Sequence, residues 1–164
     1  MAKKRLSSQS SEFSGEQKKR RREILFGSFL VLIGFLFLVS FLSYFYNWQS
    51  DQSTLEVFFD RNFQSQNILN KLGALTAHFF IYQLFGFSAF IIPSLLGYTG
   101  LVFFFSLNKK RILSQWSWAL CYMTCFMIFL GFYQESSPIF SGLVGFEVND
   151  FLVSYLGSTG LIAI

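Results

Sequence analysis

The sequence predicts an all-α membrane protein: four transmembrane helices, the fourth truncated, a helix at the outer membrane interface and a disordered basic N-terminal tail. Long apolar runs without formal charge predict the helices, because about 20 apolar residues suffice to cross the hydrocarbon core. The composition agrees: the chain is 52% hydrophobic, 21% aromatic and 13% charged, whereas soluble proteins are ~25% charged. A placement in the membrane therefore explains the sequence better than a soluble fold.

Lys and Arg are distributed unevenly along the chain. Of the 13 present, eight precede the first apolar run and three fill a short connector, which makes eleven on one predicted side. Those beside the apolar runs are Lys18, Lys19, Arg20, Arg21, Arg22, Lys109, Lys110 and Arg111. Short loops rich in Lys and Arg stay in the cytoplasm, so we expect the N-terminus and the connector on the cytoplasmic side of the lipid bilayer.

The first 23 residues are polar and form the predicted disordered tail, and residues 24–164 form the predicted transmembrane domain. The first span covers 24–46, an apolar stretch of about 34 Å at ~1.5 Å per residue. An exterior polar loop follows it. The next apolar stretch is too long for one upright helix, so we divide it near Gly86 into a helix over 67–85 and a span over 87–107. The first part can lie in the outer interface or enter steeply.

The third span covers 116–133, and an acidic exterior loop follows it. Residues 151–164 begin a fourth crossing that remains incomplete, because 14 residues rise only about 21 Å. We therefore expect this chain to be part of a longer protein.

The sequence lacks familiar catalytic and cofactor motifs. It has no G-x-x-x-x-G-K-[ST] loop for a nucleotide and no H-E-x-x-H. We predict no metal or cofactor in this segment and interpret Cys121 and Cys125 as packing residues, because a zinc site needs a shell of about four ligands. For His78, a hydrogen-bonded interfacial histidine is favoured over a pH-sensitive or catalytic group.

The polar and the small residues of the predicted membrane segments each allow two interpretations. Polar groups at Ser88, Ser94, Thr99 and Thr124 would be needed for a transporter or channel subunit, but such groups commonly hydrogen-bond between helices. Small residues let helices approach closely, either within the chain or between subunits. They are Gly73, Gly97, Gly100, Gly142, Gly145, Gly157 and Gly160.

Two stretches have an ordered set of small, aromatic and proline residues. Residues 67–93 contain Gly73-Ala74, Ala77-His78, Phe79-Phe80, Gly86 and Ile92-Pro93, and residues 141–160 contain Gly142, Gly145, Leu156, Gly157 and Gly160. The first stretch resembles the second membrane segment of the FtsK/SpoIIIE DNA translocases, and the second resembles the start of that family's fourth span. His78 departs from the family pattern, in which this polar position is often acidic.

The resemblance implies the N-terminal membrane anchor of a DNA pump at the division septum of a bacterial inner membrane. In that family, four spans precede a cytoplasmic linker and an ATPase motor that forms a hexameric ring. ATP, Mg and DNA are then expected only at the missing motor, while the membrane domain meets division-site proteins. The implied role is in cell division and chromosome partition, with no enzyme activity in this segment.

Overall fold

We describe a computed structural model in which residues 2–55, 64–132 and 139–162 are defined. Its elements are α1 (Ala2–Leu55), α2 (Asn70–Ala77), the π-helix η1 (His78–Phe85), the 3₁₀-helix η2 (Gly86–Phe90), α3 (Ile91–Phe104), the 3₁₀-turn η3 (Lys109–Arg111), α4 (Ile112–Gly131) and α5 (Gly142–Ile162). Within these ranges the protein is helical and has no strand.

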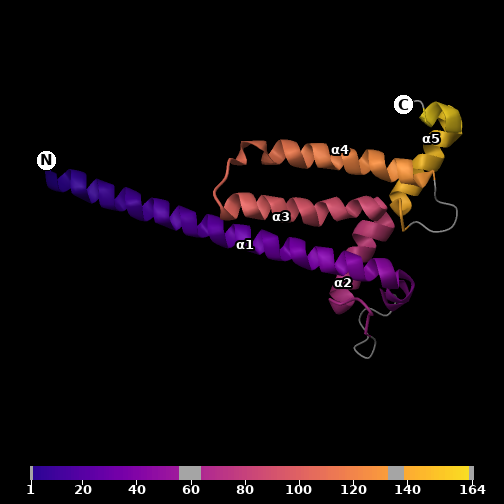
Figure 1. The fold of residues 1–164 in the computed structure, drawn as a ribbon, viewed down its shortest axis with the longest axis horizontal. Coiled ribbons are helices and arrows are strands. Elements are labelled where there is room, and N and C mark those ends of the chain that lie inside the picture. The colour runs from indigo at the N-terminus through magenta and orange to yellow at the C-terminus, as the bar shows by residue number, and fades with distance from the viewer. Residues whose placement is uncertain (1, 56–63, 133–138, 163–164) are drawn as a thin grey trace.

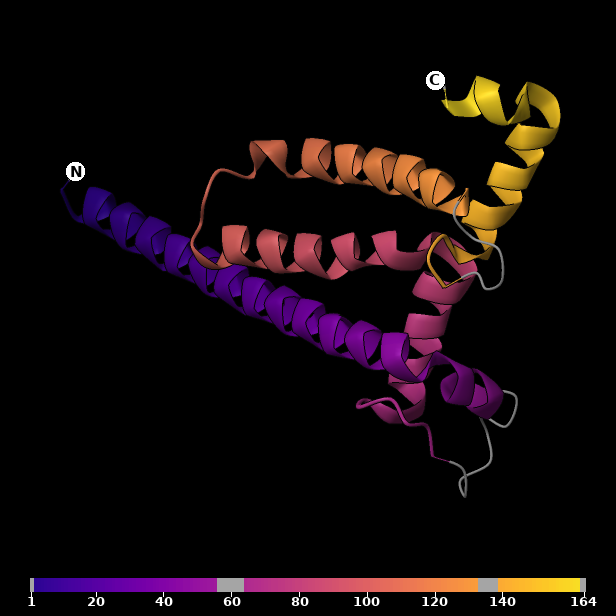
Figure 2. The same ribbon diagram turned by 45° about the vertical axis from the view of Figure 1, so that its right-hand side comes forward.

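Three long rods define the architecture. α1, α3 and α4 run side by side in both ribbon views (Figures 1 and 2). Segments long and apolar enough to cross a membrane are Gly15–Ser50, Asn70–Phe104 and Lys109–Gly131, three in the described part of the chain. The membrane character is thus as predicted, but the predicted count of four spans is not confirmed.

α2, η1 and the first part of α5 lie across the ends of the rods, away from the N-terminal tail (Figure 1). We call this the crosswise end. Gly86 marks the change of direction between η1 and α3, with φ of 59° and ψ of −138°. A backbone with these angles is almost restricted to glycine. The helix predicted over 67–85 is therefore a transverse element, divided into α-helical and π-helical parts.

α1 differs from the prediction at its N-terminus. It begins at Ala2 and continues into the first span, so residues 2–23 are helical where a disordered tail was expected. Residues 16–23 are Glu, Gln, Lys and Arg, which have good helix propensity. Extension of an existing helix also avoids the cost of nucleation. The prediction of disorder rested on the lack of large apolar residues and did not consider that the first transmembrane helix could extend toward the N-terminus.

α5 also differs from the expected fourth crossing. It begins at Gly142 inside the predicted exterior loop, and its regular geometry breaks at Gly157, which has φ of 69° and ψ of 158°. The expected start of the crossing at Phe151 thus lies within a transverse helix. Acidic Glu147 and Asp150 suggested a loop, but both side chains are exposed, where helical carboxylates remain solvated.

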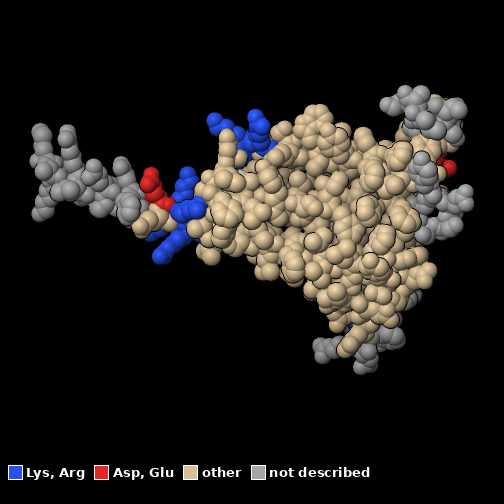
Figure 3. All heavy atoms as spheres, in the orientation of Figure 1, with Lys and Arg blue, Asp and Glu red and all other residues tan. Residues whose placement is uncertain are grey.

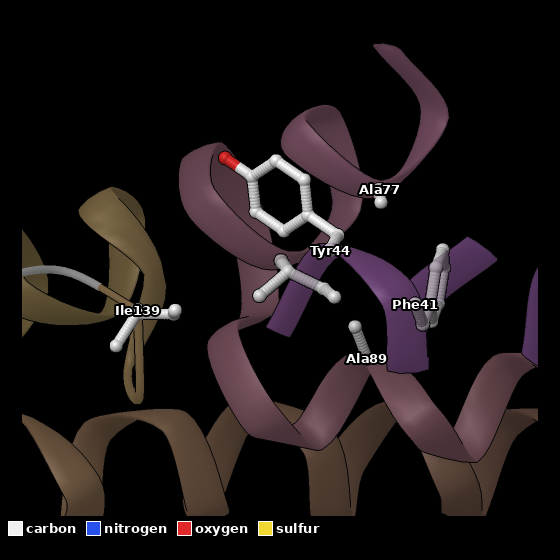
Figure 4. Packing of buried hydrophobic residues seen from close by; sticks show 6 residues of the cluster. Phe41, Tyr44, Ala77, Ala89 and Ile139 are labelled. Carbon is white, nitrogen blue, oxygen red and sulfur yellow. The ribbon is translucent and has the colours of Figure 1, made fainter. Parts of the chain in front are cut away.

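The buried core lies where α1 meets the crosswise end. Figure 4 shows how its side chains converge from α1, α2, η1, η2 and the segment before α5. Its buried members are Phe41, Tyr44, Ala77, Ile81, Ala89 and Ile139. The rods themselves keep large apolar side chains exposed, as helices that face lipid do.

Candidate functional site

α1 and α3 approach each other through glycines. A Cβ added to Gly27 would lie 2.6 Å from the carbonyl oxygen of Gly100, and one added to Gly100 would lie 2.7 Å from the oxygen of Gly27. Further along, a Cβ on Gly34 would lie 2.9 Å from the Pro93 oxygen and 3.0 Å from the Gly97 nitrogen. Backbone contact of this kind is how small residues hold membrane helices together.

Sequence reasoning named Gly100, Gly97 and Pro93 as helix-packing or motif residues without naming their partner helix, and it missed Gly27 and Gly34. A signal was present, because the two missed glycines are seven residues apart, so they share one helix face. The surroundings of Gly97 differ from the expectation: a Cβ there would meet no atom within 4 Å. Its amide, and not its missing side chain, meets α1.

A polar network joins α1 to α2. Ser40 Oγ donates to the Gly73 carbonyl at 2.7 Å, and Asn67 Nδ2 donates to the Ser40 carbonyl at 3.0 Å. Ser43 Oγ accepts from the Ile68 amide at 3.0 Å. A Cβ at Gly73 would collide with Asn67. The network therefore requires glycine at 73, and the neighbouring Ala74 and Ala77 are fully buried.

His78 lies in an aromatic group at the crosswise end. Its Nδ1 is 2.8 Å from the Tyr44 hydroxyl. Its ring stacks on Tyr82 with centroids 4.9 Å apart, and Tyr82 stacks on Trp48 at 6.1 Å. His78 therefore has the hydrogen-bonded surroundings favoured from the sequence. Tyr44 is the partner that sequence reasoning missed, since it lies 34 residues away.

Gly86 and Gly142 connect the two transverse segments. The Phe87 amide donates to the Phe140 carbonyl at 2.7 Å. A Cβ on Gly86 would overlap the Phe140 carbonyl, and one on Gly142 would overlap the Leu84 carbonyl. Both glycines have positive φ, 59° and 74°. These two sequence-predicted residues, which are far apart in the chain, are thus brought together.

α5 packs on the end of α4. Asn149 Nδ2 donates to the Ile128 carbonyl at 2.9 Å. A Cβ on Gly145 would lie 3.1 Å from Met127 Cβ, which makes Gly145 a close-contact position. A Cβ added to Gly160 would meet only Leu156 Cβ, at 3.4 Å, and a Cβ added to Gly157 would meet nothing within 4 Å. These last two predicted residues lie outside the packed surface.

Basic residues collect at the other end of the rods, near the tail (Figure 3), which we call the basic end. Lys109 Nζ lies 2.6 Å from Glu23 Oε1 and 4.7 Å from the centre of the Phe103 ring. Ser106 Oγ donates to Glu23 Oε2 at 3.1 Å. The hydrogen bond from Lys109 is the main reason that the pKa of the Glu23 carboxyl lies below its usual value.

A hollow of about 420 Å³ lies between α1 and the connector at the basic end. It is lined by Glu16, Lys19, Arg20, Glu23, Ser106, Leu107, Lys109 and Lys110. The structure thus brings together cations of the tail and of the connector, which are some 90 residues apart in sequence. Arg21 and Lys18 are exposed nearby on α1. Arg22 and Arg111 are likewise exposed.

Polar residues considered for a transport path bind helix backbone or a neighbouring side chain. Ser88 Oγ donates to the Phe85 carbonyl at 2.7 Å, Ser94 Oγ to the Phe90 carbonyl at 3.0 Å, and Thr124 Oγ1 to the Leu120 carbonyl at 2.9 Å. Thr99 Oγ1 accepts from Trp116 Nε1 at 3.0 Å. Each of these four groups thus has a structural hydrogen bond.

Comparison with known proteins gives one family. No curated protein and no solved structure matches the chain. A family model described as the 4TM region of DNA translocase FtsK/SpoIIIE matches residues 18–164, nearly the whole chain. That membrane region is a non-catalytic segment, in agreement with the helix-packing character of the contacts above. The chain therefore belongs to the family of FtsK/SpoIIIE 4TM membrane regions.

Proposed function

We propose that this chain is the membrane anchor of a septal DNA translocase, which acts in cell division and chromosome partition. The observation that carries the proposal is the family match over residues 18–164. The anchor itself performs no chemistry. It would hold a cytoplasmic motor against the inner face of the bacterial cell membrane and concentrate motor subunits in the plane of the membrane.

The charge distribution supports the orientation in this proposal. The exposed cations Lys18, Lys19, Arg20, Arg21 and Arg22 and the connector cations Lys110 and Arg111 occupy the same end of the rods (Figure 3). Positive charge is retained on the cytoplasmic side during insertion. The basic end then faces the cytoplasm and its anionic lipid headgroups, which attract such residues by about 1 kcal/mol each.

The division of labour follows from what the residues can bind. The sequence has no phosphate-binding loop, so these residues do not fit ATP and Mg. In the proposal, nucleotide, Mg and DNA bind only to the motor of a longer protein, and six copies associate through that motor. Contact with division-site proteins falls to the exposed surfaces of the membrane region.

A localisation experiment tests the proposal. Residues 1–164 fused to a fluorescent protein should collect at the division site of constricting cells. A matched fusion that replaces this segment with an unrelated four-span anchor should spread around the cell membrane. An even distribution of both fusions would refute the septal role. A reporter on the Lys109–Arg111 connector that is active only outside the cytoplasm would refute the orientation.

A second experiment addresses the transporter or channel alternative. The purified segment is reconstituted into vesicles and assayed for flux of small ions and solutes. We expect no flux above that of empty vesicles, because Ser88, Ser94 and Thr124 already bond to helix carbonyls. Selective flux that Ser94→Ala abolishes would favour the alternative.

A further inference from the structure

The crosswise end contains two segments with the same design. Each follows a rod, lies across the rod ends and begins at a residue with positive φ: Asn70, at 54°, for α2–η1 and Gly142, at 74°, for α5 (Figures 1 and 2). Each ends at a glycine with positive φ and extended ψ, Gly86 and Gly157. This conformation is essentially available only to glycine. We call Gly86 and Gly157 the corner glycines, because the backbone at both positions requires glycine.

Buried small residues occupy equivalent places in the two segments. Ala74 precedes the Gly86 corner by 12 residues, and Gly145 precedes the Gly157 corner by 12 residues. Both are buried, and the carbonyl of the residue before Ala74 accepts from α1, while Gly145 lies against α4. The first segment thus meets α1 beside Ala74, and the second meets α4 at Gly145.

The polar residue that fastens each segment is also equivalent. His78 and Asn149 both lie eight residues before their corner glycines. Nδ1 of His78 is 2.8 Å from the Tyr44 hydroxyl on α1, and Nδ2 of Asn149 is 2.9 Å from the Ile128 carbonyl on α4. The residue types differ, but each bonds to the rod that precedes its own segment.

The two segments differ in length by one residue, and the difference lies at their beginnings: Ala74 follows Asn70 by four residues, whereas Gly145 follows Gly142 by three. From Asn70 to Gly86 there are 16 steps, and from Gly142 to Gly157 there are 15. From Ala74 and from Gly145 onward, both segments have the same 12 steps to the corner glycine, although the first contains the π-helix His78–Phe85 and α5 is α-helical there.

The rods can be aligned through the same contacts. Tyr44 on α1 meets His78, and a Cβ on Gly131 of α4 would lie 2.7 Å from Asn149 Cβ. Tyr44 and Gly131 are thus equivalent, which pairs each residue of α1 with the residue 87 positions later. By this pairing, Gly27 and Gly34, the glycines of α1 that receive α3, correspond to Ser114 and Cys121.

Ser114 and Cys121 are also small, and Trp118 lies on the same face of α4 between them. That face is open: Trp118 is 60% exposed, and Ser114 and Cys121 are exposed. α3 contacts the other side of α4, where Trp116 bonds to Thr99. In Figure 2, α5 rises past α4 on the side away from α3, and its last turn bends back along α4.

We propose that the domain consists of two copies of one unit, each a rod, a transverse helix, a glycine corner and a second rod. The chain that follows Gly157 is the second rod of the second unit. It packs on the α4 face formed by Ser114, Trp118 and Cys121, as α3 packs on the Gly27–Gly34 face of α1.

Disulfide formation in native membranes tests this pairing. Gly34 of α1 meets Pro93, and the corresponding positions in the second unit are Cys121 and Ile164, 71 residues after Pro93. In a Cys125→Ser background, Ile164→Cys should form an intramolecular disulfide with Cys121 on mild oxidation. The readout is loss of both thiols from mass-tagging with a maleimide, with recovery after reduction.

A rotated cysteine provides the matched control. Tyr122→Cys, combined with Cys121→Ser and Cys125→Ser, places the thiol at the same depth but about 100° around the helix, and Ile164→Cys should not react with it. A second proposed pair is Ile128→Cys with Leu161→Cys, in the background that carries both Cys121→Ser and Cys125→Ser. These positions correspond to Phe41 and Phe90, whose ring centres are 5.8 Å apart. Failure of both proposed pairs, or equal reaction of the control, would overturn the proposal.

Discussion

Gly27 and Gly100 face each other so closely that neither has room for a side chain. A Cβ on either residue would lie within 2.7 Å of the carbonyl oxygen of the other. Because the opposing atoms belong to backbone and not to a flexible side chain, relief requires the helices to separate. The contact between α1 and α3 thus depends on both glycines.

Gly100→Val should therefore lower the free energy of unfolding by about 1–3 kcal/mol, the usual cost of overpacking a close contact. Unfolding in detergent, followed by circular dichroism as denaturing detergent is added, measures it. Gly97→Ala is the control on the same helix, since a Cβ there meets nothing within 4 Å. We expect it to be neutral or stabilising by up to about 1 kcal/mol. Equal destabilisation by both substitutions would contradict the assigned contact.

Ser40→Ala should loosen α2 from α1. The substitution removes the bond from Ser40 Oγ to the Gly73 carbonyl, 2.7 Å long and buried. Hydrogen bonds between membrane helices contribute about 0.6 kcal/mol on average and up to about 1.7 kcal/mol. The same unfolding measurement should show a loss in this range, whereas Ser28→Ala, at an exposed position of α1, should show none. A neutral Ser40→Ala would indicate that the bond adds no stability.

Tyr44→Phe tests the contact to His78 while keeping the aromatic ring in the core. The hydroxyl is 2.8 Å from His78 Nδ1, and its removal should cost about 0.5–1.5 kcal/mol. Tyr46→Phe is the matched control, because Tyr46 is 84% exposed. The imidazole proton resonances of His78, the single histidine of the chain, should shift in Tyr44→Phe and remain unchanged in the control. If the His78 resonances were the same in Tyr44→Phe and Tyr46→Phe, the Tyr44 hydroxyl would not be in contact with His78.

The Glu23–Lys109 ion pair should make the basic end sensitive to acid. Since the Lys109 hydrogen bond lowers the Glu23 pKa from its ordinary value of 4.5, the stabilisation is present above that value. It is lost as pH falls through the lowered pKa of the folded state. One spin label at exposed Ser114, in the first turn of α4 beside the connector, and a second at Lys18 on α1 should measure the distance between these elements. We expect this distance to increase when the pH is below the lowered pKa of Glu23.

Glu23→Gln should remove the acid-induced part of that separation. Glu16→Gln, which makes the same charge change beside the same hollow, should retain it. An identical acid response in Glu23→Gln and in the unsubstituted chain would show that another group controls the connector.

Much of the fold could be predicted from local properties of the sequence. Charge-free apolar runs indicated the helical membrane class, and Gly86 was correctly chosen as the point where the second run changes direction. The glycine pair 27 and 34 was missed because its partners are 59 to 73 residues away along the chain, from Gly34–Pro93 to Gly27–Gly100. Small residues within one run do not reveal which helix they meet.

The two errors at the ends of the helices have different physical causes. In residues 2–23 the absence of apolar side chains suggested disorder, although helix propensity and an adjoining helix were enough to continue α1. In residues 142–150 the acidic side chains suggested a loop, but the transverse helix exposes them and buries Gly145 and Asn149. The Tyr44–His78 bond depends on tertiary packing, which no local pattern specifies.

Gly86→Ala and Gly157→Ala should separate backbone strain from steric overlap. Both glycines have a positive φ that is costly for alanine, by about 1–3 kcal/mol. Gly86 also touches the Phe140 carbonyl, whereas a Cβ on Gly157 meets nothing within 4 Å. We therefore expect both variants to be less stable in detergent unfolding, with the larger loss at Gly86. Gly97→Ala again serves as the control with helical backbone. If Gly157→Ala matched this control, the chain would not turn at residue 157 through a left-handed backbone, and the second corner would be lost from the structure.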